Sequence, residues 1–146
     1  MTMEECKVLR EATAAEISAA VKAACEYIGV RTTLNGCKYF KEALAIIAQA
    51  IHKDFCTSPA DIGLYKHVYG PIAQAYGTYA ENVRSSMLRY VTAVLNGKVP
   101  DTHDRTILLM LKYWDLGNQR MLEVGLMYMC AYLKLLKENT NESKNT

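Results

Sequence analysis

The stretch that decides the fold is YGPIAQAYGTYAENVRSSMLRYVTAVL, residues 69–95. Its pattern predicts a helix-turn-helix, in which two short helices pack at an angle around a tight turn. Ala73 would lie where the helices cross, because only a small side chain fits there. Gly77 can take the positive φ that such a turn needs, and Val83 would pack the second helix onto the first. Neighbouring core contacts are expected from Ile72, Tyr76 and Met87.

Residues with strong helix-end preferences surround this pair. Pro71 lacks the backbone N–H of a helix interior, so it either opens the first helix or kinks a longer one. Thr78 is expected to be the N-cap of the second helix, which would run to about Leu95 and end at Asn96-Gly97. Upstream, Thr57-Ser58-Pro59 predicts an N-cap followed by proline in the first turn of another helix.

The rest of the chain also has the three-to-four-residue spacing of amphipathic helices. We expect one from Glu4 to Ile28, ended by Gly29, and another after Gly36. The latter would bury Phe40, Ala43, Leu44, Ile47 and Ile51. Further helices are expected over about residues 104–116 and 119–137, with Gly117-Asn118 as stop and cap between them.

No segment alternates in the manner of a sustained β-strand, and no internal repeat or long linker is present. The sequence therefore predicts an all-α fold of five to seven helices around one core. A single domain is expected over residues 1–137. Residues 138–146, ENTNESKNT, are expected to be a disordered tail because they are polar throughout.

Composition excludes several classes of protein. Hydrophobic residues make up 51% of the chain, as in a globular domain. No apolar run reaches 18 residues, which argues against a transmembrane helix, and the acidic N-terminus does not resemble a signal peptide. The five cysteines are scattered without a CxxC pair. This favours reduced, mostly buried thiols in a cytoplasmic protein over a disulfide framework or a zinc site.

The sequence contains no arrangement typical of an enzyme. His52, His67 and His103 are scattered, and no phosphate-binding, metalloprotease or nucleophile motif is present. We therefore expect no catalytic residue, no metal and no cofactor. The cluster LMYMCAY at residues 126–132 is expected to be core, with an adaptable binding groove as the alternative.

The second helix of the pair carries the candidate functional surface. If Val83, Met87, Tyr90 and Val91 face the core, the polar residues lie on the opposite face, which a recognition helix offers to the major groove. Asn can pair with adenine, Arg with guanine or phosphate, and Ser or Thr with phosphate. The candidate DNA-binding residues are Lys66, Thr78, Tyr79, Glu81, Asn82, Arg84, Ser85 and Arg89. The alternative is an ordinary solvated face.

The net charge of +2 is low for a DNA-binding domain. The local balance is more favourable, since Arg84, Arg89 and Lys98 stand against Glu81 alone between residues 77 and 98. Within the predicted surface, Lys66 and Thr78 would hold phosphates.

Several blocks resemble the C-terminal DNA-binding effector domain of the master sporulation response regulator of endospore-forming bacteria. Ile28-Gly29-Val30, Leu34, Gly36 and Tyr39–Leu44 are similar to that family's IGV…(I/L)xGxxYLREAI. Residues 66–73, KHVYGPIA, resemble KVLYPDIA with the proline displaced by one position. Thr78, Ala80, Val83 and Met87 fall in register on TTASRVERAI, and the chain from Asn118 onward is similar to the last helix. The resemblance spans about residues 14–137.

The resemblance implies an all-α domain that binds double-stranded DNA and regulates transcription in the cytoplasm. It also implies RNA polymerase or its sigma factor, and a second copy on DNA, as partners. Three departures from the family are expected to matter. Asn82-Val83-Arg84-Ser85 stands where the family has Arg-Val-Glu-Arg, so both expected base-reading arginines are absent, and Tyr79 replaces a Thr. We also expect no receiver domain before the effector, so neither the family's DNA element nor control by phosphorylation is implied. The rival hypothesis is a non-catalytic protein-interaction module on the same fold.

Overall fold

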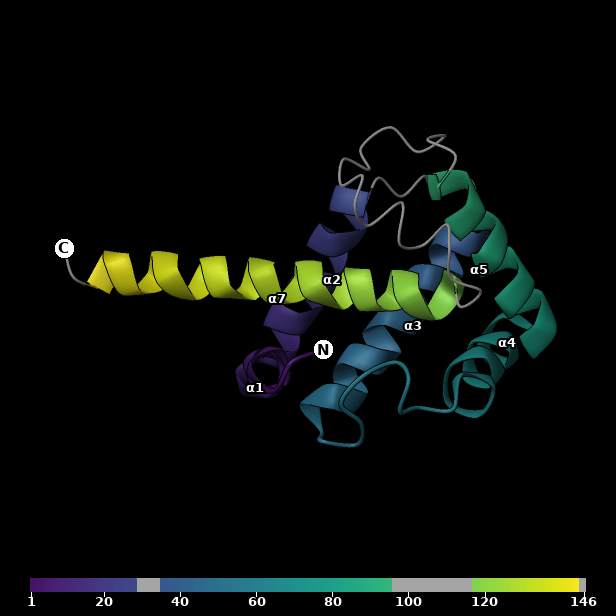
Figure 1. The fold of residues 1–146 in the computed structure, drawn as a ribbon, viewed down its shortest axis with the longest axis horizontal. Coiled ribbons are helices and arrows are strands. Elements are labelled where there is room, and N and C mark those ends of the chain that lie inside the picture. The colour runs from purple at the N-terminus through teal and green to yellow at the C-terminus, as the bar shows by residue number, and fades with distance from the viewer. Residues whose placement is uncertain (29–34, 96–116, 145–146) are drawn as a thin grey trace.

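The computed structural model describes residues 1–28, 35–95 and 117–144, and the remainder is drawn in grey (Figure 1). The described residues form helices and no strand, which confirms the all-α prediction. No helix among these residues is both long and apolar enough to span a bilayer. The elements are α1 (Met3–Glu11), α2 (Ala14–Ile28), α3 (Asn35–His52), the π-helical turn η1 (Tyr65–Tyr69), α4 (Gly70–Tyr76), α5 (Ala80–Leu95) and α7 (Gly117–Lys144).

The N-terminal segment is two helices, so the prediction of one helix over residues 4–28 was wrong. α1 ends at Glu11, and α2 begins at Ala14. The break arises because Thr13 and Glu16 form a second capping box, in which each side chain accepts a hydrogen bond from the other's backbone N–H. Thr2 and Glu5 form the same arrangement at the start of α1.

The core forms where α3 packs between the other helices. Every residue that the periodicity assigned to the buried face of α3 is buried. α7 passes across α2 and α3 and is the longest helix described, while α4 and α5 lie together at one end of the molecule (Figure 1). Leu126, Met129 and Cys130 are buried, whereas Met127 is half exposed, so the cluster at 126–132 is mainly core. All five cysteines are free and buried, as predicted.

Close approach of α3 and α5 requires a glycine. A Cβ added at Gly36 would lie 2.1 Å from the carbonyl oxygen of Ser86 and 2.8 Å from the Cβ of Tyr90. A backbone oxygen cannot move aside as the tip of a side chain can. Gly36 therefore allows α5 to lie close to α3. This close packing sets the position of the α5 surface relative to the core.

Two helix-end predictions differ from the structure. Residues 53–63 contain no helix, and Pro59 lies in a turn closed by the Asp61 N–H and the Ser58 carbonyl. The predicted helix after Thr57-Ser58-Pro59 is therefore absent, because the turn satisfies those backbone groups locally. At the other end, α7 continues past Lys137 to Lys144 and takes in most of the predicted tail. Elongating an existing helix needs no new nucleus, and Glu and Lys are good helix formers.

Tyr76 is less buried than predicted. Its side chain is 41% exposed and its ring meets the edge of the Tyr39 ring, at 5.4 Å between centroids. Gly29, Asn96-Gly97, Lys98, His103 and the expected helix over 104–116 lie outside the described residues.

Candidate nucleic-acid interface

The connection between α4 and α5 contains the positive-φ glycine that its sequence predicts. Gly77 ends α4 in the left-handed conformation, with φ of 66°. Ala73 and Val83 are buried on the two sides of this turn, at 4% and 0% exposure. Pro71 is the second residue of α4, which directly follows η1, and the Gly70 N–H donates to the Tyr65 carbonyl. The missing N–H of proline is accommodated at that helix start.

The faces of α5 are divided as the periodicity predicts. Val83, Met87, Tyr90 and Val91 are buried, and they are joined by Ser86. The residues on the other side are at least partly accessible: Glu81, Asn82 and Arg89 are exposed, and Arg84 and Ser85 are half-buried. The packing of one side therefore leaves a polar surface on the other.

The turn and the first part of α5 are joined by a side-chain hydrogen bond. The Nδ2 amide of Asn82 donates to the Thr78 hydroxyl at 2.8 Å. α5 begins at Ala80, so Tyr79 holds its N-cap position. The prediction of Thr78 as the N-cap was wrong by one residue. The bond uses one of the two N–H groups of the amide, and the second N–H and the carbonyl oxygen can still meet an adenine edge.

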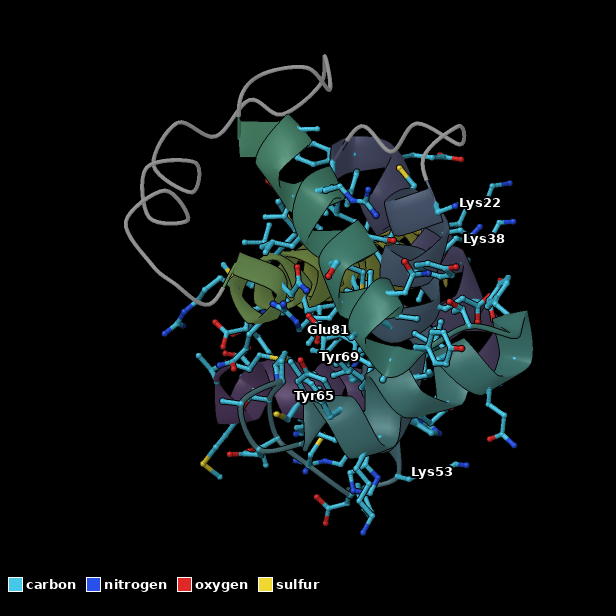
Figure 2. The ribbon with its side chains drawn as sticks, turned by 90° about the vertical axis from the view of Figure 1, so that its right-hand side faces the viewer. Lys22, Lys38, Lys53, Tyr65, Tyr69 and Glu81 are labelled. Carbon is cyan, nitrogen blue, oxygen red and sulfur yellow. The ribbon has the colours of Figure 1, made fainter. Side chains whose placement is uncertain are left out.

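Glu81 is held in a network that the sequence did not predict. The Arg84 Nε donates to both carboxylate oxygens of Glu81 at 3.1 Å, and the Tyr65 hydroxyl donates to one of them at 2.7 Å. The hydrogen bond from Arg84, followed by that from Tyr65, lowers the pKa of Glu81 to about 2. The same pairing raises the pKa of the Arg84 guanidinium. Figure 2 shows Tyr65, Tyr69 and Glu81 next to one another on this side of the molecule.

Arg89, Tyr79 and Lys66 complete the predicted set. Arg89 is exposed, donates to Ser86 at 3.3 Å, and has no carboxylate within ion-pair distance in the described part of the chain. Tyr79 is 82% exposed at the start of α5. Lys66 is exposed on η1, and no hydrogen bond or ion pair to α5 is found for it among residues 35–95. The structure thus brings together the residues of the turn and of α5. Lys66 lies on η1, which packs against α5 through its neighbour Tyr65.

Asn118 anchors α5 from a distant part of the chain. Its Nδ2 donates to the Arg84 carbonyl at 3.0 Å and to the Tyr69 hydroxyl at 3.2 Å, while its Oδ1 is buried without a hydrogen-bond partner. A pocket of about 200 Å³ lies beside it. The pocket is lined by Leu64, Tyr65, Tyr69, Arg84, Leu88, Gly117, Asn118 and Gln119. The sequence predicts Gly117-Asn118 as a helix stop and cap, whereas α7 already begins at Gly117 and contains Asn118. The partners of Asn118 are 34 and 49 residues away, so they leave no local signal in the sequence.

The charge on the α5 surface is close to balanced. Because Glu81 pairs with Arg84, the net positive charge of this surface comes from Arg89. In the described residues no cluster of His, Cys, Asp or Glu could hold a metal ion. The arrangement offers amide, hydroxyl and guanidinium groups for hydrogen bonding.

Comparisons of the chain with protein-family models, with curated proteins and with solved structures find no match. Its function is therefore inferred from the residues and their geometry.

Proposed function

We propose that the chain is a DNA-binding transcription regulator that uses α4, the Gly77 turn and α5 as a helix-turn-helix, with α5 entering the major groove. The observation that carries the proposal is the division of α5 into a fully buried apolar side and an accessible side bearing Asn82, Ser85 and Arg89. A recognition helix needs both, since one side fixes the helix to the domain and the other meets base edges.

Three of the accessible groups on α5 would contact DNA directly. Asn82 would pair with an adenine, and the hydrogen bond to Thr78 would limit the orientations of its amide before DNA arrives. Arg89 would contact phosphate or guanine, and Ser85 would contact phosphate. We further propose that the protein acts in the cytoplasm, and that a second copy and RNA polymerase or its sigma factor are partners on the promoter.

Selection of bound sequences from a pool of random duplexes tests this proposal. We expect the unmodified chain to enrich a short element that contains an invariant adenine, and Asn82→Ala to lose the preference at that base. Each good bidentate pair is worth about 1–3 kcal/mol of discrimination. Lys53→Ala is the control, since Lys53 lies well away from Glu81 (Figure 2) and should leave the selected element unchanged. Absence of any enriched element would contradict the proposal.

A second candidate is a protein-interaction module on the same fold. The observation in its favour is the near-neutral surface, in which Arg84 is already paired and Tyr65, Tyr79 and Leu88 are exposed beside it. Exposed aromatic residues are frequent in protein interfaces. Lack of binding to any duplex at about 50 mM salt, where phosphate contacts are strong, would favour this candidate.

A further inference from the structure

The carboxylate of Glu81 accepts hydrogen bonds from Arg84 and Tyr65, which lie on different elements. Arg84, one turn further along α5, reaches both oxygens through Nε and one of them through Nη2. Tyr65, on η1, donates to the oxygen Oε2 at 2.7 Å. The side chains remain accessible, at 60% exposure for Glu81 and 37% for Arg84. The pair is therefore formed at the surface that the proposed function assigns to DNA.

We propose that Glu81 restrains Arg84 and thereby lowers the affinity of the α5 surface for DNA; this inference rests on the proposed function. A guanidinium presents the same planar fork of N–H donors to a carboxylate and to a phosphate. A phosphate group must displace Glu81 before it can use the donors of Arg84 that face the carboxylate. The Glu81 charge also repels the DNA backbone wherever it stays in place.

Tyr65 is the positioning residue of this restraint. Its hydroxyl fixes the Glu81 carboxylate from outside α5, so the carboxylate cannot turn away without losing that hydrogen bond. The Tyr65 ring meets the edge of the Tyr69 ring at 5.3 Å between centroids. Tyr69 is itself buried and accepts a hydrogen bond from Asn118. Buried groups therefore position Tyr65, and through it the Glu81 carboxylate.

The first experiment removes the charge and keeps the shape. Glu81→Gln should bind a short random-sequence duplex more tightly than the unmodified chain. One phosphate contact changes affinity by about threefold between 50 and 200 mM salt. The gain should accordingly be about threefold larger at the lower salt. Glu11→Gln is the matched control, because Glu11 pairs with Lys7 and Lys137 at the surface of α1, and it should leave binding unchanged.

A double-mutant cycle separates restraint of Arg84 from simple repulsion by Glu81. If the carboxylate acts through Arg84, Glu81→Gln should gain little in an Arg84→Ala background. Tyr65→Phe alone should move affinity and salt slope in the same direction as Glu81→Gln, by a smaller amount. A full gain in the Arg84→Ala background would overturn the inference, as would an effect of Glu11→Gln equal to that of Glu81→Gln.

The outcomes also separate this inference from the proposed function. If the unmodified chain binds duplex DNA and Glu81→Gln binds with the same affinity and salt slope, the restraint is wrong and DNA binding stands. If neither protein binds at about 50 mM salt, the proposed function fails and the restraint fails with it. Circular dichroism of each variant should match that of the unmodified chain, because these side chains lie outside the core.

Discussion

The backbone N–H of Thr78 donates a hydrogen bond of 2.9 Å to the carbonyl oxygen of Ala73, and this bond closes the C-terminus of α4. The N–H of Gly77 donates to the same oxygen. The Gly77 bond is an ordinary helical one, whereas the Thr78 bond depends on the left-handed conformation of Gly77, which is a common way to end a helix. The direction in which α5 leaves α4 is set by these three residues.

Gly77→Ala should destabilise the fold by about 1–2 kcal/mol, the usual cost of placing a Cβ in left-handed backbone. A Cβ at this position would meet no atom within 4 Å, so the whole effect comes from φ. Urea unfolding measures the change. Gly63→Ala is the control, because a Cβ there has ordinary space and φ is not positive. Equal stability of the two variants would show that the turn does not need Gly77.

Gly36→Ala should be more damaging, because its Cβ would collide with the Ser86 carbonyl and force α5 away from α3. We expect a loss of about 1–3 kcal/mol or more from overpacking, measured by thermal unfolding. Gly125→Ala provides the comparison. Its Cβ would meet the tip of the Leu44 side chain, which can move, so a smaller loss is expected. The reverse order of the two losses would contradict the packing of α3 on α5.

Asn118→Ala should cost about 1–3 kcal/mol, since it removes the donor to the Arg84 carbonyl and to the Tyr69 hydroxyl. Chemical denaturation provides the value. Asn139→Ala, on the exposed side of the same helix, should change stability by less than about 0.5 kcal/mol. If the two substitutions are equally mild, Asn118 does not anchor α5 to α7.

The Glu81 carboxyl should titrate near pH 2 in an NMR titration, because Arg84 and Tyr65 lower its pKa to about 2. A lowered pKa means that the pairing stabilises the fold above the ordinary carboxyl pKa of 4.5, and that this stabilisation is lost as pH falls through about 2. Arg84→Ala should raise the pKa of Glu81 more than Tyr65→Phe does, since Arg84 is the larger cause. Titration of the unmodified residue near pH 4.5 would show that the network is not formed.

Local patterns predicted much of the fold. The periodicity of α3 and α5 identified their buried sides, and Gly77 marked a turn because few other residues favour positive φ. The division between α1 and α2 could also have been found, since Thr13 and Glu16 have the spacing of a capping box. The apolar residues keep the same spacing across the break, so their periodicity alone does not reveal it.

The interactions of the candidate site were harder to predict. Tyr65 and Glu81 are 16 residues apart, and Asn118 is 34 residues from Arg84. Such pairs depend on how the helices pack, which periodicity does not determine. The sequence identified which α5 residues are accessible, but it did not show that one of its two arginines is already paired with Glu81.

The salt dependence of DNA binding by the unmodified chain and by Arg89→Ala tests the central claim most directly. We predict that the unmodified chain binds duplex DNA, and that Arg89→Ala weakens binding to all sequences and lowers the salt slope by about one unit. The matched loss of charge in Lys53→Ala should leave the slope unchanged, because Lys53 lies well away from Glu81 (Figure 2). Identical slopes for the unmodified chain and Arg89→Ala would contradict the assignment of α5 as the DNA-binding helix.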